Sequence, residues 1–327
     1  MTKILLTGGA GYIGSHTAKR LFQSGFEPVT LDDLSAGHAW AVKWGPLIQG
    51  DIGDEKLIRD VVAKYDIQAV LHFAALASVG ESIIHPRKYF DNNVSRTLNM
   101  LRALVDCSVK HVIFSSSCAT YGDPLRVPID ETHPQKPVNP YGETKLMVER
   151  ILHWYDLAYG MRSACLRYFN AAGADPDGEL GELHAPEQHL IPLVMQAATG
   201  AIDSVSIFGT DYPTPDGTAI RDYTHVCDLA DAHVLALKHL LDGGDALQLN
   251  LGTGRGHSVL EVIGAVEEVS GRSVPTRRTE RRPGDPPELV ADATKAGEVL
   301  NWKARFLDLR ELIRTAWAWH TSSAKPS

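Results

Sequence analysis

A glycine-rich turn near the start of the chain restricts the possible fold more than any other feature. An apolar run, Lys3 to Thr7, leads directly into the segment GGAGYIG at residues 8–14, and an amphipathic stretch follows over residues 12–24. A Gly-x-Gly-x-x-Gly spacing between a strand and a helix permits a tight turn and a close approach of the backbone to a pyrophosphate. The free N–H groups at the helix N-terminus also favour phosphate. The sequence therefore predicts a strand–turn–helix unit that binds a dinucleotide.

A carboxylate supports this prediction. Asp32 ends the apolar stretch 28–32, at the distance of about 20 residues where a ribose hydroxyl is bound. Its charge would repel a 2′-phosphate, so NAD is the expected cofactor, in preference to the phosphorylated form. Asp33 is either a second ribose contact or a turn residue. The residues expected at the cofactor from this motif are Gly8, Gly11, Tyr12, Ile13, Gly14, Asp32 and Asp33.

The first half of the chain alternates between two kinds of segment. Apolar, β-branched runs occur at 3–7, 28–32, 69–73, 111–116 and 163–169, and helical patterns at 12–24, 54–65, 86–107 and 141–159. Strands that are apolar throughout are typical of a parallel sheet covered on both faces. The pattern predicts an α/β fold, a doubly wound Rossmann domain.

The composition changes after Asn170. Residues 171–187 and 209–219 are rich in Gly, Pro and acidic residues, which indicates loops, whereas 228–241 is a helix pattern and 247–251 a strand pattern. Helices are also predicted at 258–270 and 307–319. We expect an NAD-binding domain over 1–175, to which 224–252 returns, and a smaller, partly interleaved α/β substrate-binding domain in the remaining segments of 176–327.

Composition excludes several classes of protein. The chain of 327 residues has 32 Lys and Arg against 40 Asp and Glu, a net charge of −8, so no basic surface for nucleic acid is expected. No apolar run approaches the ~20 residues of a membrane span, and the N-terminus lacks a signal-peptide core. The four cysteines form no Cys-x-x-Cys pair, so no metal site is expected and Cys118 is interpreted as packing. These features predict a soluble, cytoplasmic protein.

A second motif contains residues suited to proton transfer. Tyr141 and Lys145 open a predicted helix with i, i+4 spacing, which places them on one face. A free tyrosine has a pKa of about 10, and a nearby ammonium and a positively charged nicotinamide would both lower it. Lys145 can also donate to the nicotinamide ribose. Ser115 to Ser117 end a predicted strand, where doubly wound sheets bind ligands. We therefore predict Tyr141 as the acid–base group, assisted by Lys145 and Ser117.

Through these motifs, the chain resembles the extended short-chain dehydrogenase/reductase superfamily, and within it the UDP-glucose 4-epimerase family. The resemblance extends from Lys3 to about His320. The further matching segments are Gly50–Ile52, His72–Ala75, Val79–Ser82, Tyr89–Asn93, Leu166–Asn170, Ala219–Tyr223 and Arg281–Asp285.

The resemblance implies roles for individual residues. Asp51 and Ile52 would contact adenine. Other NAD contacts would come from Phe73, Ala74, Ala75, Asn93, Ser115, Tyr141, Lys145 and Tyr168. The UDP-sugar would be bound by Ser117, Tyr141, Asn170, His189, Leu190, Phe208, Arg221, Arg282, Asp285 and Leu289. The side-chain chemistry agrees, because guanidinium groups bind a diphosphate, Phe208 offers uracil an apolar face and Asp285 can accept from ribose hydroxyls.

Three positions depart from the family pattern. Ala77 stands where many relatives have a lysine that helps to hold the cofactor, so the expectation of very tight NAD retention is weaker. His189 replaces an asparagine found in some relatives, which makes its individual role less secure. Leu289 replaces a tyrosine that closes the sugar pocket in some members, and this leaves the breadth of substrates open.

The resemblance implies an isomerase that interconverts UDP-galactose and UDP-glucose through a transient 4-keto sugar, with the hydride taken and returned by bound NAD. A UDP-xylose/UDP-arabinose or dual-specificity 4-epimerase is the alternative on the same mechanism. A 4,6-dehydratase or decarboxylase would need a carboxylate beside the serine, where this chain has Cys118-Ala119-Thr120. A third alternative is a regulator that only senses NAD. Such a protein would be free to lose the catalytic residues, whereas Tyr141, Lys145 and Ser117 are all present in this chain.

A homodimer is also expected. The predicted helices around 92–107 and 141–159 carry apolar residues on more faces than one contact with a sheet can cover, and an exposed apolar stripe often marks an interface. These residues are Val94, Leu98, Leu101, Leu104, Val105, Met147, Ile151, Trp154, Tyr155 and Ala158. In the resembled family, these helices pair into a four-helix bundle.

Overall fold

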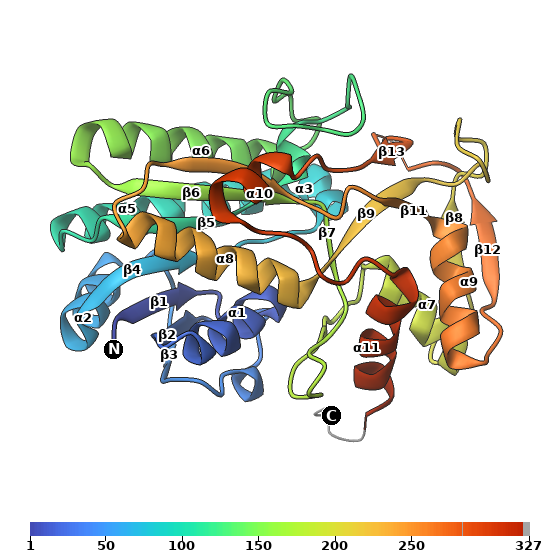
Figure 1. The fold of residues 1–327 in the computed structure, drawn as a ribbon, viewed down its shortest axis with the longest axis horizontal. Coiled ribbons are helices and arrows are strands. Elements are labelled where there is room, and N and C mark those ends of the chain that lie inside the picture. Colours follow the sequence, from blue (N-terminus) through green and yellow to red (C-terminus); the bar gives the residue numbers. More distant parts are fainter. Residues whose placement is uncertain (283, 323–327) are drawn as a thin grey trace.

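A parallel sheet forms the centre of the larger part of the molecule. The computed structural model describes residues 1–282 and 284–322, and its largest sheet has seven strands in the order β10-β6-β5-β4-β1-β2-β3 (Figure 1). Up to β6, the elements are β1 Lys3–Thr7, α1 Tyr12–Gln23, β2 Glu27–Asp32, β3 Leu47–Gln49, α2 Glu55–Tyr65, β4 Ile67–His72, α3 Val79–Ile84, α4 Pro86–Phe90, α5 Arg96–Asp106, β5 His111–Ser117, α6 Pro140–Tyr159 and β6 Arg162–Tyr168. All six pairings in this sheet are parallel.

Helices cover both faces of this sheet, which explains why its strands are apolar throughout. Ile4 and Leu6 of β1 belong to a core cluster with α1 and α8 (Val226–Leu241). Leu5, between them, belongs to a second cluster with α2, α5 and α6. Successive side chains of a strand point to opposite faces, so each strand contributes to both cores. The predicted Rossmann fold is confirmed.

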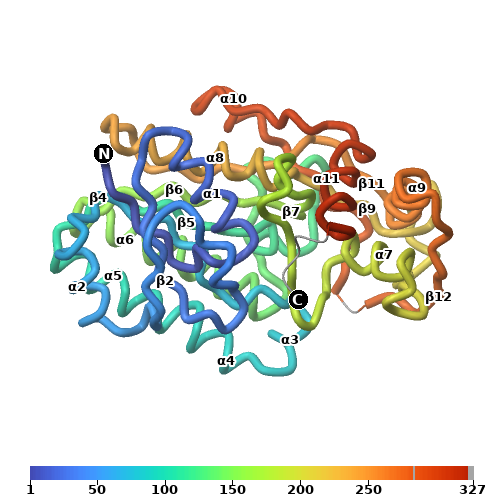
Figure 2. The backbone as a smooth tube through the Cα atoms, turned by 90° about the horizontal axis from the view of Figure 1, so that it is seen from below, coloured from blue at the N-terminus to red at the C-terminus, as the bar shows by residue number. Residues whose placement is uncertain are grey.

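Two elements from much later in the sequence complete the sheet. Strand β10 (Leu247–Leu251) pairs with β6, with Leu247 opposite Ala164 and Leu251 opposite Tyr168. Helix α8 packs beside α1 on one face of the sheet, as both views of the molecule show (Figures 1 and 2). The chain therefore leaves the large sheet after β6 and comes back to it.

The smaller part of the molecule surrounds strand β9 (Ile220–His225). This strand pairs with β7 and β13 in parallel and with β11 antiparallel, and β8 pairs with β12. The remaining elements are β7 Asn170–Ala172, α7 Leu190–Thr199, β8 Val205–Phe208, β11 Gly256–Ser258, α9 Val259–Ser270, β12 Thr276–Thr279, β13 Glu288–Leu289, α10 Thr294–Leu300 and α11 Leu309–Thr321. Helices α7, α9 and α11 share one apolar core with β8.

The structure corrects two predictions about helices. The helix expected over 86–107 is divided into α4, a π-helical turn at Asp91–Ser95, and α5. Within the apolar stripe predicted to be exposed, Val94, Leu101 and Leu104 are buried, and Leu101 and Leu104 pack into the core against the sheet.

In the part of the chain that the structure describes, no helix has the length and apolar character to cross a membrane.

Candidate active site

The glycine turn lies between β1 and α1, where side chains would not fit. Gly8 has a φ of +74°, and a Cβ added to it would lie 2.5 Å from the backbone nitrogen of Ala74. A Cβ on Gly14 would lie 2.4 Å from the carbonyl oxygen of Gly8. Gly11 is the N-cap of α1 and has no side chain to bond the first N–H groups of the helix. This bare helix N-terminus fits the pyrophosphate of a dinucleotide.

Three carboxylates lie beside the turn. Asp32 accepts hydrogen bonds from the backbone nitrogens of Ala10 and Leu34, both at 2.9 Å, so it joins the end of β2 to the glycine turn. Burial raises the pKa of Asp32 above its usual value. Asp33 and Asp51 come together around Arg96 of α5, whose guanidinium is 3.1 Å from Asp51 and 4.0 Å from Asp33. This role of Arg96 was not predicted from the sequence.

The residues after β4 close the other side of the turn. The backbone nitrogens of Phe73 and Ala74 donate to the carbonyl of Thr7 at 2.8 and 3.0 Å. Asn93 lies in the π-helical turn, and its side-chain amide bonds the backbone of Leu76 and the hydroxyl of Thr144, 3.1 Å away. Asn93 thus holds the segment after β4 against α6.

The other predicted residues occupy less distinctive positions. Tyr12 begins α1 and donates its hydroxyl to the carbonyl of Gly173 at 2.6 Å, which links the turn to the loop after β7. Ile52 is buried, Ile13 packs on the core beneath α1, and Leu190 on the core around α7. Ala75 is half-buried, and Asn170 lies in β7 opposite Tyr223 of β9.

The predicted catalytic side chains meet where β5 and β6 end. Helix α6 begins at Asn139, which accepts from the nitrogen of Gly142 at 2.8 Å, so Tyr141 and Lys145 lie in its first turns. The ammonium of Lys145 donates to the carbonyl of Ser115 at 2.8 Å and lies 5.7 Å from the centre of the Tyr141 ring. Ser117 lies close enough to Tyr141 to oppose the rise in the pKa of its phenol, and Ser115 bonds the hydroxyl of Tyr168.

In the protein alone, burial dominates the charge states at this site. Burial raises the pKa of Tyr141 above its usual range, nearby Tyr168 acts in the same direction, and only Ser117 opposes them. Burial also lowers the pKa of Lys145 to about 7, so its positive charge is not secure at neutral pH. The expected lowering of the tyrosine pKa by Lys145 therefore does not occur in the protein alone, because both groups are removed from water.

A buried ion pair between Arg167 and Glu149 lies next to the end of β5, the strand that carries Ser115 to Ser117. Ser116 donates to the carboxylate of Glu149 at 2.5 Å, and Arg167 donates to the same carboxylate through two nitrogens, at 2.9 and 2.6 Å. Burial opposes the charge of Arg167, but Glu149 outweighs it and holds the pKa of the guanidinium above its usual range. This pair anchors the strand end that carries Ser115 and Ser117.

Several residues predicted to bind UDP form a second group on β8, β9, residue 282 and the segment 284–289. The guanidinium of Arg282 stacks 3.8 Å above the ring of Phe208. Arg221 on β9 forms an ion pair with Asp285. Leu289 on β13 lies opposite Arg221 in the strand register. Two cations, a carboxylate and an aromatic face therefore come together in this group.

Cys118 lies between the two groups. It belongs to a buried apolar cluster with Tyr121 and Phe169, against which Leu289 packs. Burial raises its pKa to about 12, and Arg221 is close enough to oppose that shift. The thiol also acts electrostatically on Tyr141. Cys118 is thus a neutral packing residue. It lies between the predicted catalytic residues at the end of β5 and the residues predicted to bind UDP.

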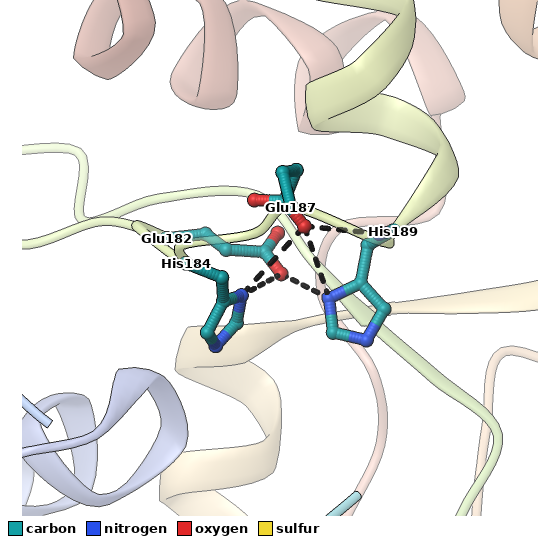
Figure 3. A group of neighbouring side chains, drawn as sticks. All are labelled: Glu182, His184, Glu187 and His189. Atoms are coloured by element: carbon teal, nitrogen blue, oxygen red, sulfur yellow. Dashed lines mark hydrogen bonds and ion pairs between the residues drawn. The ribbon is translucent and has the colours of Figure 1, made fainter. Parts of the chain in front are cut away.

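His189 behaves differently from the other predicted substrate residues. Its Nδ1 bonds Glu182, in a cluster with His184 and Glu187 on the loop before α7 (Figure 3). Burial favours the neutral form of Glu182, but the two histidines lower its pKa to about 2. In the described chain, no hydrogen bond or ion pair joins His189 to the other predicted UDP residues. The spacing Glu-x-His-x-x-Glu-x-His over residues 182–189 was the signal for this cluster, and the cysteine spacing did not reveal it.

The geometry can now be compared with known proteins. The model of the NAD dependent epimerase/dehydratase family matches residues 4–252 of this chain. The chain belongs to this family. Among curated members, a UDP-glucose 4-epimerase of Rhizobium leguminosarum bv. trifolii is 52% identical over 320 residues, which cover 98% of each chain.

Solved structures of family members agree closely with this one. A UDP-glucose 4-epimerase from Brucella ovis in complex with NAD has a TM-score of 0.95 and 53% identity, covering 97% of this chain and 98% of that chain. The UDP-glucose 4-epimerase from Stenotrophomonas maltophila, with bound NAD and formylated UDP-arabinopyranose, has a TM-score of 0.93 and 44% identity, covering 98% of each. The chain therefore resembles epimerases of this family over nearly its whole length.

Proposed function

We propose that this family member is an isomerase that interconverts UDP-galactose and UDP-glucose by inversion at carbon 4 of the sugar. The observation that carries the proposal is the meeting of Tyr141, Lys145 and Ser117 at the end of β5, in a chain 52% identical to a UDP-glucose 4-epimerase. A coupled assay that measures formation of UDP-glucose from UDP-galactose tests it. Absence of turnover in the NAD-loaded protein would exclude it.

In this proposal, NAD binds along the glycine turn. Its contacts are Gly8, Gly11, Tyr12, Ile13, Gly14, Asp32, Asp33, Asp51, Ile52, Phe73, Ala74, Ala75, Asn93, Ser115, Tyr141, Lys145 and Tyr168. The support is steric and electrostatic: the turn has no room for side chains at Gly8 and Gly14, and Asp32 opposes a 2′-phosphate. When bound, NAD supplies a carrier for the hydride at carbon 4, and its positive nicotinamide favours the phenolate of Tyr141.

The residues of the chain move the proton and hold the sugar. The phenolate of Tyr141 accepts the proton of the sugar 4-hydroxyl, while Ser117 hydrogen-bonds that oxygen and Lys145 holds the cofactor ribose. The 4-keto sugar then rotates to present its other face, and Tyr141 returns the proton to the same oxygen. Anchoring of the UDP keeps the keto sugar from escaping during this movement. No net oxidation occurs.

Binding of the UDP moiety, which anchors the sugar, is assigned to the residues predicted to bind UDP. We propose contacts to the UDP-sugar from Ser117, Tyr141, Asn170, His189, Leu190, Phe208, Arg221, Arg282, Asp285 and Leu289. His189 would make its contact through Nε2, because its Nδ1 bonds Glu182. Arg282 stacks on one face of the Phe208 ring, so uracil would use the other face or displace Arg282. Arg221 and Arg282 provide the donors for the diphosphate.

A pentose substrate is the second candidate. The related protein from Stenotrophomonas maltophila holds a formylated UDP-arabinopyranose, and the proposed chemistry at carbon 4 does not require carbon 6. Loss of the carbon 6 hydroxymethyl contacts would cost ~1–3 kcal/mol. UDP-xylose and UDP-arabinose are therefore proposed as substrates on the same mechanism.

Leu289 is expected to restrict the sugar pocket. UDP-glucose and UDP-galactose should give the highest kcat/KM, UDP-pentoses a lower value and UDP-N-acetylglucosamine the lowest, because Leu289 fills space that an N-acetyl group needs. Leu289→Ser should raise kcat/KM for UDP-N-acetylglucosamine relative to UDP-glucose by about tenfold, since such steric differences are worth about 1–3 kcal/mol. Equal kcat/KM for both sugars in the parent protein would contradict this role.

We also propose a division of the chain into an NAD-binding domain, 1–175 with 224–252, and a UDP-sugar-binding domain in the remaining segments of 176–327. The pairing of β10 with β6 and the packing of α8 on α1 support the assignment of 224–252 to the NAD-binding domain.

The four cysteines are free, which supports a reducing compartment, the cytoplasm, as the place of action.

A homodimer through α5 and α6 is the last part of the proposal. Trp154 and Leu157 on α6 are each 65% exposed, although both are large and apolar. We expect a dimer mass by sedimentation at micromolar protein, and a monomer for Trp154→Glu because a charge would be buried in the interface. Leu125→Glu is the control, since Leu125 is 76% exposed but lies outside both helices. A monomeric parent protein would contradict the proposal.

A further inference from the structure

Four side chains of one short loop converge on a common point before α7. Glu182, His184, Glu187 and His189 each present one ligand atom there, and these atoms lie within 4.8 Å of one another (Figure 3). Nδ1 of His184 is 3.2 Å from Glu182 and 3.7 Å from Glu187. Nδ1 of His189 is 3.8 Å from Glu187 and bonds Glu182. Both imidazoles thus turn the same nitrogen toward the same two carboxylates.

The two carboxylates are withdrawn from solvent without a lysine or arginine. The side chains of Glu182 and Glu187 are only 8% and 6% exposed. In the described part of the chain, their ion pairs involve histidines alone. Glu187 also accepts from the backbone nitrogens of Gln188 and His189 at 2.8 and 2.9 Å. A bound metal ion would replace the imidazole protons as the positive partner of the two carboxylates.

A neighbouring group of carboxylates on the same loop is paired with a lysine of α1. Asp175, Asp177 and Glu179 surround the ammonium of Lys19 at 2.8, 2.7 and 2.7 Å. That position is already filled by a cation of the protein. The cluster at 182–189 differs because it combines imidazole nitrogens with carboxylates, which is a set of donors for a transition metal.

The distances also suit a metal. Tetrahedral zinc has bonds of about 2.0–2.2 Å to histidine and carboxylate, which separates its ligand atoms by about 3.3–3.6 Å. Three of the four distances between histidine and carboxylate are 3.2, 3.7 and 3.8 Å. The fourth pair, Nδ1 of His189 and Glu182, is in hydrogen-bond contact and would have to move apart to admit an ion among the four atoms. Two nitrogen donors favour zinc over magnesium or calcium, which prefer oxygen.

We propose that Glu182, His184, Glu187 and His189 form a binding site for one divalent transition-metal ion of the zinc type. With four protein ligands the site is closed, as structural zinc sites are. It goes beyond the proposed epimerase reaction, because the ion holds the loop in place and takes no part in hydride or proton transfer.

The surroundings show what the ion would hold. The carbonyl of Glu182 accepts from the indole of Trp319 on α11 at 3.1 Å, and the carbonyl of Leu183 lies 3.0 Å from the ring of His38. The backbone nitrogen of His38 donates to the carbonyl of Ala10 in the glycine turn. His189 is the N-cap of α7. The ion would therefore connect the loop that contacts the glycine turn and α11 to the start of α7.

Zinc binding by the full-length, NAD-loaded protein tests the proposal. After dialysis against a chelator, Zn²⁺ is titrated in competition with a chromophoric chelator, and bound metal is counted by elemental analysis. We expect one Zn²⁺ per chain, and at least about tenfold weaker binding in His184→Ala, because one of the four ligands is lost. Mg²⁺ at the same concentration should not compete.

His257→Ala is the matched control, since His257 also lies beside a carboxylate, 3.8 Å from Glu261, but outside the cluster. It should retain the zinc affinity of the parent protein. Glu182→Gln is a second variant with nearly the same shape, in case the alanine variant unfolds, and it should also bind at least about tenfold more weakly. Absence of stoichiometric zinc in the parent protein, or equal losses in His184→Ala and His257→Ala, would show that the cluster is an ion-pair network without a metal.

Discussion

Replacement of Tyr141 by phenylalanine is expected to lower kcat for UDP-galactose by ~10²–10⁴-fold, the usual contribution of general acid–base catalysis. The substitution removes only the phenolic oxygen, the atom proposed to take the proton from the sugar. Since the ring remains, NAD and UDP should bind with nearly unchanged affinity, which isothermal titration can measure alongside the assay.

Tyr159→Phe is the control for this experiment. Tyr159 ends the same helix but is 49% exposed and makes its ring contact with Tyr155, away from Ser117. Its loss of a hydroxyl should leave kcat within about twofold of the parent value. If Tyr141→Phe also kept half of the parent activity, the assignment of Tyr141 as the acid–base group would be wrong.

Arg167→Met should lower the free energy of unfolding by about 3–5 kcal/mol, because it leaves the Glu149 carboxylate buried without its partner. Both side chains of this pair are only 5% exposed. The shift in the midpoint of urea unfolding measures the loss. Addition of Glu149→Gln to the same chain should recover part of it, since the unpaired buried charge is then removed.

Arg162→Met is the matched control on the same strand. Arg162 pairs with Asp245 at 2.9 Å, but these side chains are 40% and 93% exposed. Exposed ion pairs contribute about 0–1 kcal/mol, so this variant should remain within about 1 kcal/mol of the parent protein. Equal losses for Arg162→Met and Arg167→Met would show that burial of the Glu149–Arg167 pair is not what makes it important.

Six of the seven strands of the large sheet were predictable because their signals are local, whereas β3, with only three residues, was not predicted. Lys3 to Thr7 was predicted as a strand and is β1. The glycine segment, the helix after it and the carboxylate at the end of the next strand all lie within about 30 residues, the size of one βαβ unit. The strands are apolar on both faces because α1 and α8 cover one face and α2, α5 and α6 the other.

The smaller part was less predictable because its elements are short or lack periodicity. Helix α7 has apolar residues on most sides and Pro192 in its first turn, where proline is tolerated, so neither amphipathicity nor a start signal marked it. Strand β12 has the sequence TRRT and is exposed; its partner, β8, determines it as a strand. The π-helical turn at Asp91–Ser95 depends on Asn93 reaching Leu76 and Thr144, contacts that helical spacing does not encode.

The same distinction applies to the site. Tyr141 and Lys145 are one helical turn apart, so their proximity follows from the sequence. The approach of Arg96 to Asp33 and Asp51, and of Arg167 to Glu149, depends on how strands and helices pack. The pKa of Lys145 could not be predicted either, since the lowering to about 7 is caused by burial.

Retention of an isotope at carbon 4 tests the central claim most directly. The NAD-loaded protein is incubated in ordinary water with UDP-galactose that carries deuterium at carbon 4, and the product is examined by NMR and mass spectrometry. We predict UDP-glucose with the deuterium still at carbon 4, because the same hydride returns to the other face of the sugar. Loss of the deuterium to water, or no UDP-glucose at all, would contradict the proposed reaction.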